Sequence, residues 1–260
     1  DHGNLFGAIS FHDALKKRGI NPIIGCEMYV AKTNHLDRDP SAGRPNHLIV
    51  LCENEKGYQN LVKLVSKAYL DGFYYKPRID KELLAQHSEG LIGLSACLNG
   101  EVAANLLPGR FEQAESAAMQ YAEIFGKDRF FLEIHDHGLE KQRKIVPDIL
   151  KISQRTGLKV AASNDCHYMQ QDDCRAHDLL LCIQTGKTVN DPNRMKFYTD
   201  QFYFKTTAEM RELFHDLPQS IDNTNEIVDK VDVLNLKKDI LLPAFPVPKS
   251  FQIHEDNNLN

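Results

Sequence analysis

An acid and an imidazole stand two positions apart in the segment SNDCHY, as Asp165 and His167. In an extended chain, residues two apart point to the same side, so one divalent cation could bind both side chains. The same spacing also arises by chance in a chain with 11 histidines, and a turn after a strand is the alternative. If the segment is extended, Cys166 points the opposite way, into the core.

Other residues with metal-binding side chains occur where predicted strands or turns end. They are His2 with Asp1, Glu27, Cys97, and His135 with His137. Strand ends converge at one edge of α/β folds, so these side chains would meet there. Taken singly, Asp1 could cap a helix and Asp165 a turn. Glu27 could be a surface acid and Cys97 a core thiol. Their recurrence at successive strand ends favours a shared site.

The mixture of donor atoms predicts the class of metal and of reaction. Imidazoles, carboxylates and one thiolate are typical of zinc, manganese or iron, whereas an all-oxygen set favours magnesium or calcium. Ligands from several strands could hold two or three ions. Ions roughly 4 Å apart activate water and bind the oxygens of an in-line displacement at phosphorus. We therefore expect phosphoester hydrolysis. The residues do not distinguish a nucleotide substrate from a sugar phosphate.

The elements that would position these residues follow from hydrophobic periodicity. Five apolar runs predict strands at 22–31, 47–54, 90–98, 129–137 and 158–167. Helical spacing occurs at 7–19, 57–72, 111–126 and 139–157. Alternating strands and helices predict a parallel sheet, open or closed into a barrel. After residue 170 only helices are predicted, and the proline-rich and polar end is typical of an exposed linker.

Composition excludes several classes of protein. The 260 residues, 42% of them hydrophobic, suffice for one large domain or for one domain with a small appendage, and the net charge of -5 excludes a histone-like nucleic-acid binder. No apolar run approaches the roughly 18 residues of a membrane span, and the N-terminus does not have the pattern of a signal peptide. The six cysteines form no CxxC motif and are expected to be reduced thiols. We expect a soluble cytoplasmic protein without a membrane partner.

Two further stretches combine basic and aromatic residues. NRMKFY lies at 193–198 and YLDGFYYKPR at 69–78. Both could contact a nucleic acid, because bases stack on aromatic rings and cations bind phosphates. The alternatives are a solvated loop for the first stretch and a cover over the sheet edge for the second.

Six segments also keep the order and spacing of a known family. They are DHGNLFG, GINPIIGCEMYVA, NHLIVLCENEKGYQNLVKLVSKAYLDGFYYKPRID, GLIGLSACLNGEV, SNDCHY and LLPAFPVP. They resemble the polymerase and histidinol phosphatase (PHP) domain of bacterial DNA polymerase III alpha subunits, over essentially the whole chain. The resemblance implies a distorted (β/α)7 barrel at 1–184, a helical extension at 185–242, and a linker toward the polymerase palm at 243–260.

The resemblance also implies a cleft that holds up to three metal ions, commonly zinc or manganese. By motif it assigns the ligands to His2, Glu27, His47, Cys97, Asp165 and His167. His47 is added by the resemblance alone, because it stands at the start of a predicted strand. His137 and Asp1 are left as residues that support a ligand or face the substrate, and His135 ranks below them.

For function, the resemblance implies a DNA-directed DNA polymerase, a nucleotidyltransferase of DNA replication, with a metal-dependent 3′–5′ exonuclease site for proofreading. The implied partners are the DNA primer terminus, the rest of the alpha subunit, and replisome subunits such as a separate proofreading exonuclease. One alternative is a catalytically idle scaffold that docks that exonuclease. A free-standing phosphatase is disfavoured, because the GYQNL and LLPAFPVP segments resemble the polymerase version.

The chain departs from the family pattern at its beginning. The family opens with a strand that carries an HxH motif, a SLLDG segment and a second strand, and none of these precedes DHGN here. We therefore expect an N-terminally truncated domain that has lost two strands and most of the ligands of one metal ion. Nucleotide addition would belong to the palm, outside these residues.

Overall fold

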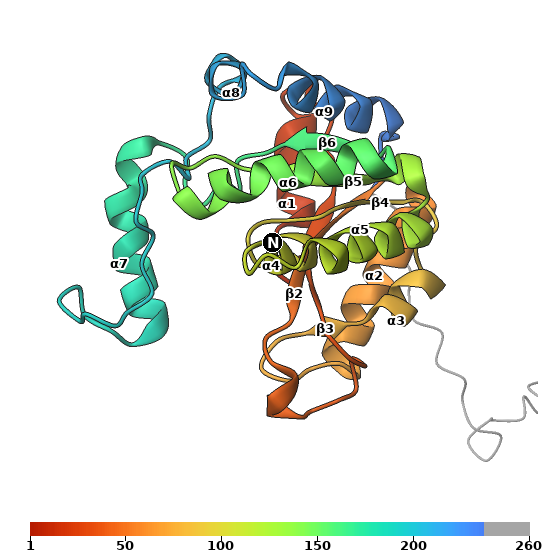
Figure 1. The fold of residues 1–260 in the computed structure, drawn as a ribbon, viewed down its shortest axis with the longest axis horizontal. Coiled ribbons are helices and arrows are strands. Elements are labelled where there is room, and N and C mark those ends of the chain that lie inside the picture. Colours follow the sequence, from red (N-terminus) through yellow and green to blue (C-terminus); the bar gives the residue numbers. More distant parts are fainter. Residues whose placement is uncertain (237–260) are drawn as a thin grey trace, which may run out of the picture.

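A computed structural model describes residues 1–236, so the predicted linker at 243–260 lies outside the described residues. Within them, six strands form one sheet in the order β3-β1-β2-β4-β5-β6 (Figure 1). The strands are β1 (Gly25–Val30), β2 (Asn46–Cys52), β3 (Arg78–Ile79), β4 (Leu91–Leu94), β5 (Phe130–Ile134) and β6 (Lys159–Ala162). The helices are α1 (Ala8–Lys16), α2 (Glu55–Leu70), α3 (Lys81–Gln86), α4 (Glu101–Leu106), α5 (Phe111–Phe125), α6 (Glu140–Thr156), α7 (Cys174–Thr185), α8 (Thr207–Leu213) and α9 (Pro218–Lys230).

Strand β2 runs against both of its neighbours, whereas the other paired strands are parallel. The prediction of a parallel sheet is therefore wrong at β2. The chain between β1 and β2 contains one short 3₁₀ turn but no α-helix. Parallel neighbours usually need a helical crossover, whereas antiparallel neighbours do not. The sequence predicts no helix between the first two apolar runs. That absence is the sequence signal for an antiparallel second strand.

The mixed α/β fold and the helices after residue 170 are confirmed. Each of the five predicted strands is present, though shorter than its apolar run. In the described part of the chain, β3 and β6 are the end strands of the sheet order, so closure into a seven-stranded barrel stays a prediction. No helix in residues 1–236 is long and apolar enough to cross a membrane.

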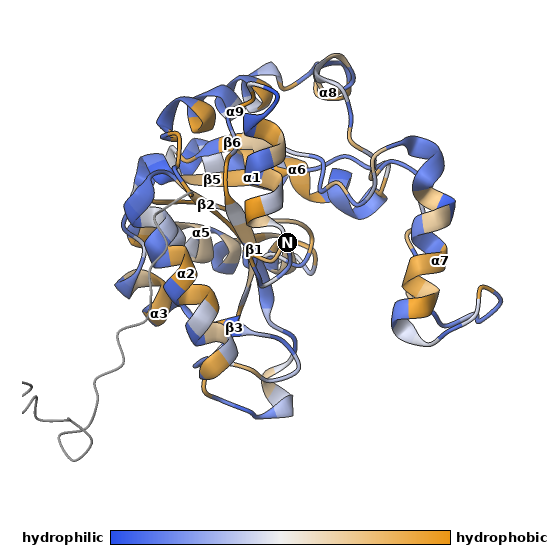
Figure 2. Ribbon diagram, turned by 180° about the vertical axis from the view of Figure 1, so that it is seen from behind, coloured by the Kyte–Doolittle hydropathy of each residue, from blue (hydrophilic) through white to orange (hydrophobic). Residues whose placement is uncertain are grey.

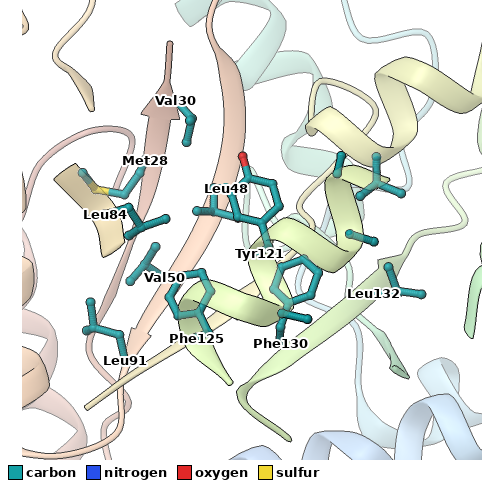
Figure 3. Close-up of a cluster of buried hydrophobic side chains, with 14 of the residues drawn as sticks. Met28, Val30, Leu48, Val50, Leu84, Leu91, Tyr121, Phe125, Phe130 and Leu132 are labelled. Carbon is teal, nitrogen blue, oxygen red and sulfur yellow. The ribbon is translucent and has the colours of Figure 1, made fainter. Parts of the chain in front are cut away.

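One face of the sheet forms the main core with helices α2 to α6. Alternate residues of β1 and β2 point into it, including Met28, Val30 and Val50, all at most 1% exposed. Figure 3 shows Met28 beside Leu84 and Val50 beside the ring of Phe125. Burying one large apolar side chain contributes about 1.5–3 kcal/mol, so this face holds sheet and helices together.

The opposite face of the same strands carries different residues. Glu27 and Tyr29 of β1 share this face with His47, because Tyr29 pairs with His47 across the two strands. Farther along, Ile49 packs against a smaller apolar cluster that includes Ile227 of α9. Polar side chains thus gather at one end of this face, and the apolar cluster covers the rest.

Candidate metal centre

The N-terminal residues lie beside β1 and bring His2 to Glu27. The backbone N–H of Gly3 donates to the carbonyl of Glu27 (2.8 Å), and the N–H of Glu27 donates to the carbonyl of Asp1 (3.0 Å). This pairing places His2 Nδ1 3.1 Å from Glu27 Oε2. The Asp1 carboxylate accepts a hydrogen bond from the N–H of Gly7 (2.8 Å), at the start of α1. Asp1 therefore accepts a hydrogen bond at the start of α1, as the helix-capping alternative predicts.

Three of the predicted ligands form the tightest group in the described residues. Glu27, His47 and Cys97 each offer a ligand atom within 4.8 Å of the other two. His47 Nδ1 contacts Glu27 Oε1 and lies 3.6 Å from Cys97 Sγ. The two carboxylate oxygens of Glu27 thus face two different histidines, His2 and His47. A carboxylate, an imidazole and a thiolate at this separation match the donors that zinc takes in proteins.

The reversed direction of β2 explains why His47 belongs to this group. Its first residues lie beside the carboxyl end of β1, since Asn46 pairs with Val30. A residue at the start of this antiparallel strand therefore reaches the same edge as residues at the ends of its neighbours. The expectation that ligands occur only at strand ends misses His47 for this reason.

The loop after β4 holds Cys97 against His47 through backbone contacts. The N–H of His47 donates to the carbonyl of Asn99 (3.1 Å), and the N–H of Gly100 donates to the carbonyl of Cys97 (2.8 Å). A Cβ atom at Gly100 would lie 2.0 Å from the carbonyl oxygen of Ser95. Only glycine allows this close approach, so Gly100 fixes the loop that presents the thiol.

Asp165 and His167 lie in a turn rather than in an extended strand. Strand β6 ends at Ala162, and Asp165 has a φ of +41°. Its Oδ1 nevertheless lies 3.4 Å from His167 Nε2, so the two side chains meet. Cys166 is exposed, and the prediction that it points into the core is wrong. Alternation of side chains holds in a strand but not through a turn with a left-handed residue.

His2 lies between these two groups. Its ring centroid is 6.2 Å from that of His47 and 6.2 Å from that of His167. The six predicted ligands therefore gather around one end of the sheet, and their role as ligands stays a prediction.

The ionisable groups of the centre differ in how readily each one could bind a cation. Burial lowers the pKa of His2, which keeps its imidazole neutral. Burial raises the pKa of the Cys97 thiol to about 12, so metal binding there would release a proton. Burial alone would raise the pKa of Asp165, but the hydrogen bond from His167 and the nearby charge of His135 lower it to about 2. Asp165 is thus a carboxylate at neutral pH.

A buried polar network beside the centre was only partly anticipated. His135 Nε2 lies 2.7 Å from Ser163 Oγ and 3.2 Å from Glu133 Oε1, and Ser163 donates to Glu133 (2.5 Å). Burial would lower the pKa of His135, but the Glu133 carboxylate outweighs it and raises that pKa. The sequence signal is the period-two spacing of Glu133, His135 and His137 in the apolar run at 129–137, although β5 itself ends at Ile134. His135 Nε2 is therefore engaged by Ser163 and Glu133, in agreement with the low rank that the resemblance gives His135 as a site residue.

His137 is fully buried and contacts the turn that carries Asp165. Its Nε2 lies 2.7 Å from the carbonyl oxygen of Asn164. Gln142 accepts the backbone N–H of His137 with Oε1 (2.9 Å), so its amide nitrogen must be the donor to His137 Nδ1 (2.8 Å). The neutral ring therefore carries its proton on Nε2 and donates to Asn164. A substrate cannot reach this side chain without displacing the residues that cover it.

This geometry predicts a loss of stability in mild acid through His137. Burial lowers its pKa to about 4, below the ordinary value near 6.5. Between these values the unfolded chain binds a proton that the folded chain excludes. The free energy of unfolding is therefore at its full value above pH ~6.5. It falls by about 3 kcal/mol as the pH drops toward about 4. Urea unfolding between pH 7 and 4.5 measures this dependence.

His137→Gln should flatten the pH dependence, because glutamine does not titrate. His215→Gln is the matched control, since His215 is exposed and its removal should leave the curve unchanged. Parallel curves for wild type and His137→Gln would contradict the assignment.

Comparison with known proteins places this geometry in a family context. The PHP domain family profile matches residues 1–137. DNA polymerase III subunit alpha of Treponema pallidum is 47% identical over 98% of this chain and 22% of its own length. The same subunit of Borreliella burgdorferi is 44% identical over 96% of this chain and 22% of its own length. That of Thermus aquaticus is 43% identical over 96% of this chain and 21% of its own length. The chain spans about a fifth of the length of these curated relatives.

Proposed function

This chain belongs to the PHP-domain family, and from that premise we propose that it forms the PHP domain of a bacterial replicative DNA polymerase alpha subunit. In this proposal the candidate metal centre is a 3′–5′ exonuclease site of the proofreading type. The observation that carries it is the approach of Glu27, His47 and Cys97 to within 4.8 Å, with three further predicted ligands beside them.

The donor set fits the metals that PHP domains use. Imidazole, carboxylate and thiolate donors together suit zinc, and the imidazoles and carboxylates also suit manganese. The proposed ligands are His2, Glu27, His47, Cys97, Asp165 and His167, with up to three ions in a complete barrel. When bound, such ions would polarise a phosphodiester and lower the pKa of the water that attacks it.

The chain's own residues would prepare the centre in two ways. Glu27 holds the rings of His2 and His47 by contacts to both of its oxygens, and Tyr29 packs edge-on against His47 with ring centroids 5.3 Å apart. His137 and its hydrogen bond to Asn164 hold the turn that presents Asp165. Ligands fixed in this way need little reordering when a substrate binds, which favours catalysis.

Asp165→Asn in the full-length protein tests the proposal. The amide has the size of the carboxylate but not its negative charge, so the cation should bind more weakly. We expect release of the 3′ nucleotide from a mismatched primer, with manganese or zinc supplied, to fall at least about 10-fold, since even outer partners of metal ligands contribute 10–100-fold. Nucleotide addition by the polymerase should stay at the wild-type rate.

Asp216→Asn is the control. The Asp216 side chain is 87% exposed, lies in the loop between α8 and α9, and contacts only His215 among the ion pairs of the described residues. Wild-type hydrolysis by Asp165→Asn would overturn the exonuclease proposal. A protein that binds the metals yet leaves mismatched ends intact would instead favour the scaffold that docks a separate exonuclease subunit.

A further inference from the structure

A solvent-open hollow lies between α7 and the chain that follows it. Figures 1 and 2 show this part of the molecule extending away from the sheet. The hollow has a volume of about 350 Å³, within the range of pockets that hold small ligands. Its walls include Tyr168, Arg175, His177, Lys196, Phe197 and Tyr198. The NRMKFY stretch, which the sequence left open between a solvated loop and a nucleic-acid contact, thus supplies one wall.

Specific contacts hold the two walls together. Arg194 donates two hydrogen bonds to the carboxylate of Asp178 on α7, at 2.6 and 2.8 Å. The ring of Phe197 packs edge-on against His177, with centroids 5.1 Å apart. The hollow is therefore built by paired side chains from both segments.

The charge of the walls favours an anion with an aromatic part. Arg194 neutralises Asp178, while Arg175 and Lys196 have no carboxylate within ion-pair distance in the part of the chain that the structure describes. The other acid at the hollow, Asp200, accepts hydrogen bonds from Gln171 and from Gln201. Exposed cations beside the tyrosine and phenylalanine rings resemble the combination that binds single-stranded nucleic acids.

The hollow adjoins the candidate metal centre. The ring of His167 lies 4.7 Å from that of Phe197 and 5.5 Å from that of His177, between centroids. Tyr168, the next residue in the chain, lines the hollow. His167 is thus a proposed ligand on one side and a neighbour of the hollow's aromatic wall on the other.

We propose that this hollow binds the 3′-terminal nucleotide of a single DNA strand, with its base on the aromatic wall and its phosphodiester directed toward the metal centre. Aromatic rings stack with any base, so the site would accept a terminal nucleotide whatever its identity. Lys196 and Arg175 supply the cations for the phosphate backbone. The proposal rests on the proposed exonuclease function and names where its substrate lies.

Photocross-linking tests the inference without requiring hydrolysis. A single strand that ends in 4-thiothymidine is irradiated with the full-length protein in the presence of a chelator, and adducts are mapped by mass spectrometry. We expect adducts within residues 168–200. The double variant Lys196→Ala with Tyr198→Ala should lower their yield at least about fivefold, the lower end of what one base stack contributes.

The control is Lys63→Ala with Phe11→Ala, which removes one cation and one aromatic ring outside both basic and aromatic stretches. Phe11 is 49% exposed on α1, and Lys63 is an exposed residue of α2, so neither side chain supports the core. Adducts only outside 168–200, or an unchanged yield in the Lys196 and Tyr198 variant, would overturn the inference. Cross-linking that persists while Asp165→Asn hydrolyses at the wild-type rate would retain the binding site and reject the exonuclease proposal.

Discussion

Glu27→Gln should remove most of the metal bound by the folded protein and slow release of a mismatched 3′ nucleotide more than about 100-fold. That loss exceeds the 10–100-fold that removal of an outer partner costs. The reason is the position of Glu27, whose two oxygens contact His2 and His47 and which lies within 4.8 Å of Cys97. Glutamine keeps the size of the side chain but removes the negative charge that would offset a cation. Elemental analysis after dialysis and a primer-hydrolysis assay measure the two effects.

Glu89→Gln is the matched control for this substitution. Its carboxylate is 78% exposed and lies 3.7 Å from Lys56, so its loss should leave metal content and hydrolysis unchanged. The free energy of unfolding of Glu27→Gln, measured with a chelator present, should fall by about 1–3 kcal/mol, because the Glu27 side chain is only 12% exposed and the substitution weakens its contacts with two histidines. Wild-type metal content in Glu27→Gln would remove Glu27 from the ligand set.

Phe130→Ala should lower the free energy of unfolding by about 4 kcal/mol, in the range for aromatic residues truncated in a core. Phe130 is 1% exposed, and its ring lies 5.4 Å from that of Tyr121 and 6.2 Å from that of Phe125, between centroids (Figure 3). Truncation removes these contacts and leaves a cavity between β5 and α5. Since domains are stable by about 5–15 kcal/mol, the loss is a large part of the total. Urea unfolding followed by circular dichroism measures it.

Phe204→Ala provides the comparison, because Phe204 is 64% exposed. Its truncation should change the free energy of unfolding by less than about 0.5 kcal/mol. Phe130→Leu, which keeps most of the buried volume, should fall between the two and remains measurable if the alanine variant does not fold. A loss below about 1 kcal/mol for Phe130→Ala would contradict the role given to this ring.

Much of the fold was predictable because its signals are local. Apolar runs identified five of the strands, and helical spacing identified the long helices such as α2, α5 and α6. Strand β3 has two residues, and α3 and α4 have six each, which is too short for a periodic pattern. The reversed direction of β2 depends on its pairing with β1 and β4, and a strand's own residues do not specify the direction of its partners.

The site was predictable in its residue types but not in its geometry. Asp165 and His167 meet as expected, but through a turn with a left-handed residue instead of an extended strand. The contact of His135 with Ser163 depends on the pairing of β5 with β6, which lie far apart in the sequence. Contacts of this kind follow from strand order and register, and neither can be read from the spacing of residues along the chain.

The division of β1 and β2 into two faces has a consequence for how such a domain changes over generations. Met28 and Val30 pack in the core, while Glu27 and His47 lie on the other face, in the candidate metal centre. A mutation at Glu27 or His47 would therefore alter the proposed metal centre without removing an apolar contact from the core. Selection can act on the two faces separately, so a lineage could lose the proposed reaction and keep the domain. In such a lineage, the proposed ligand positions would drift while the buried positions between them would not.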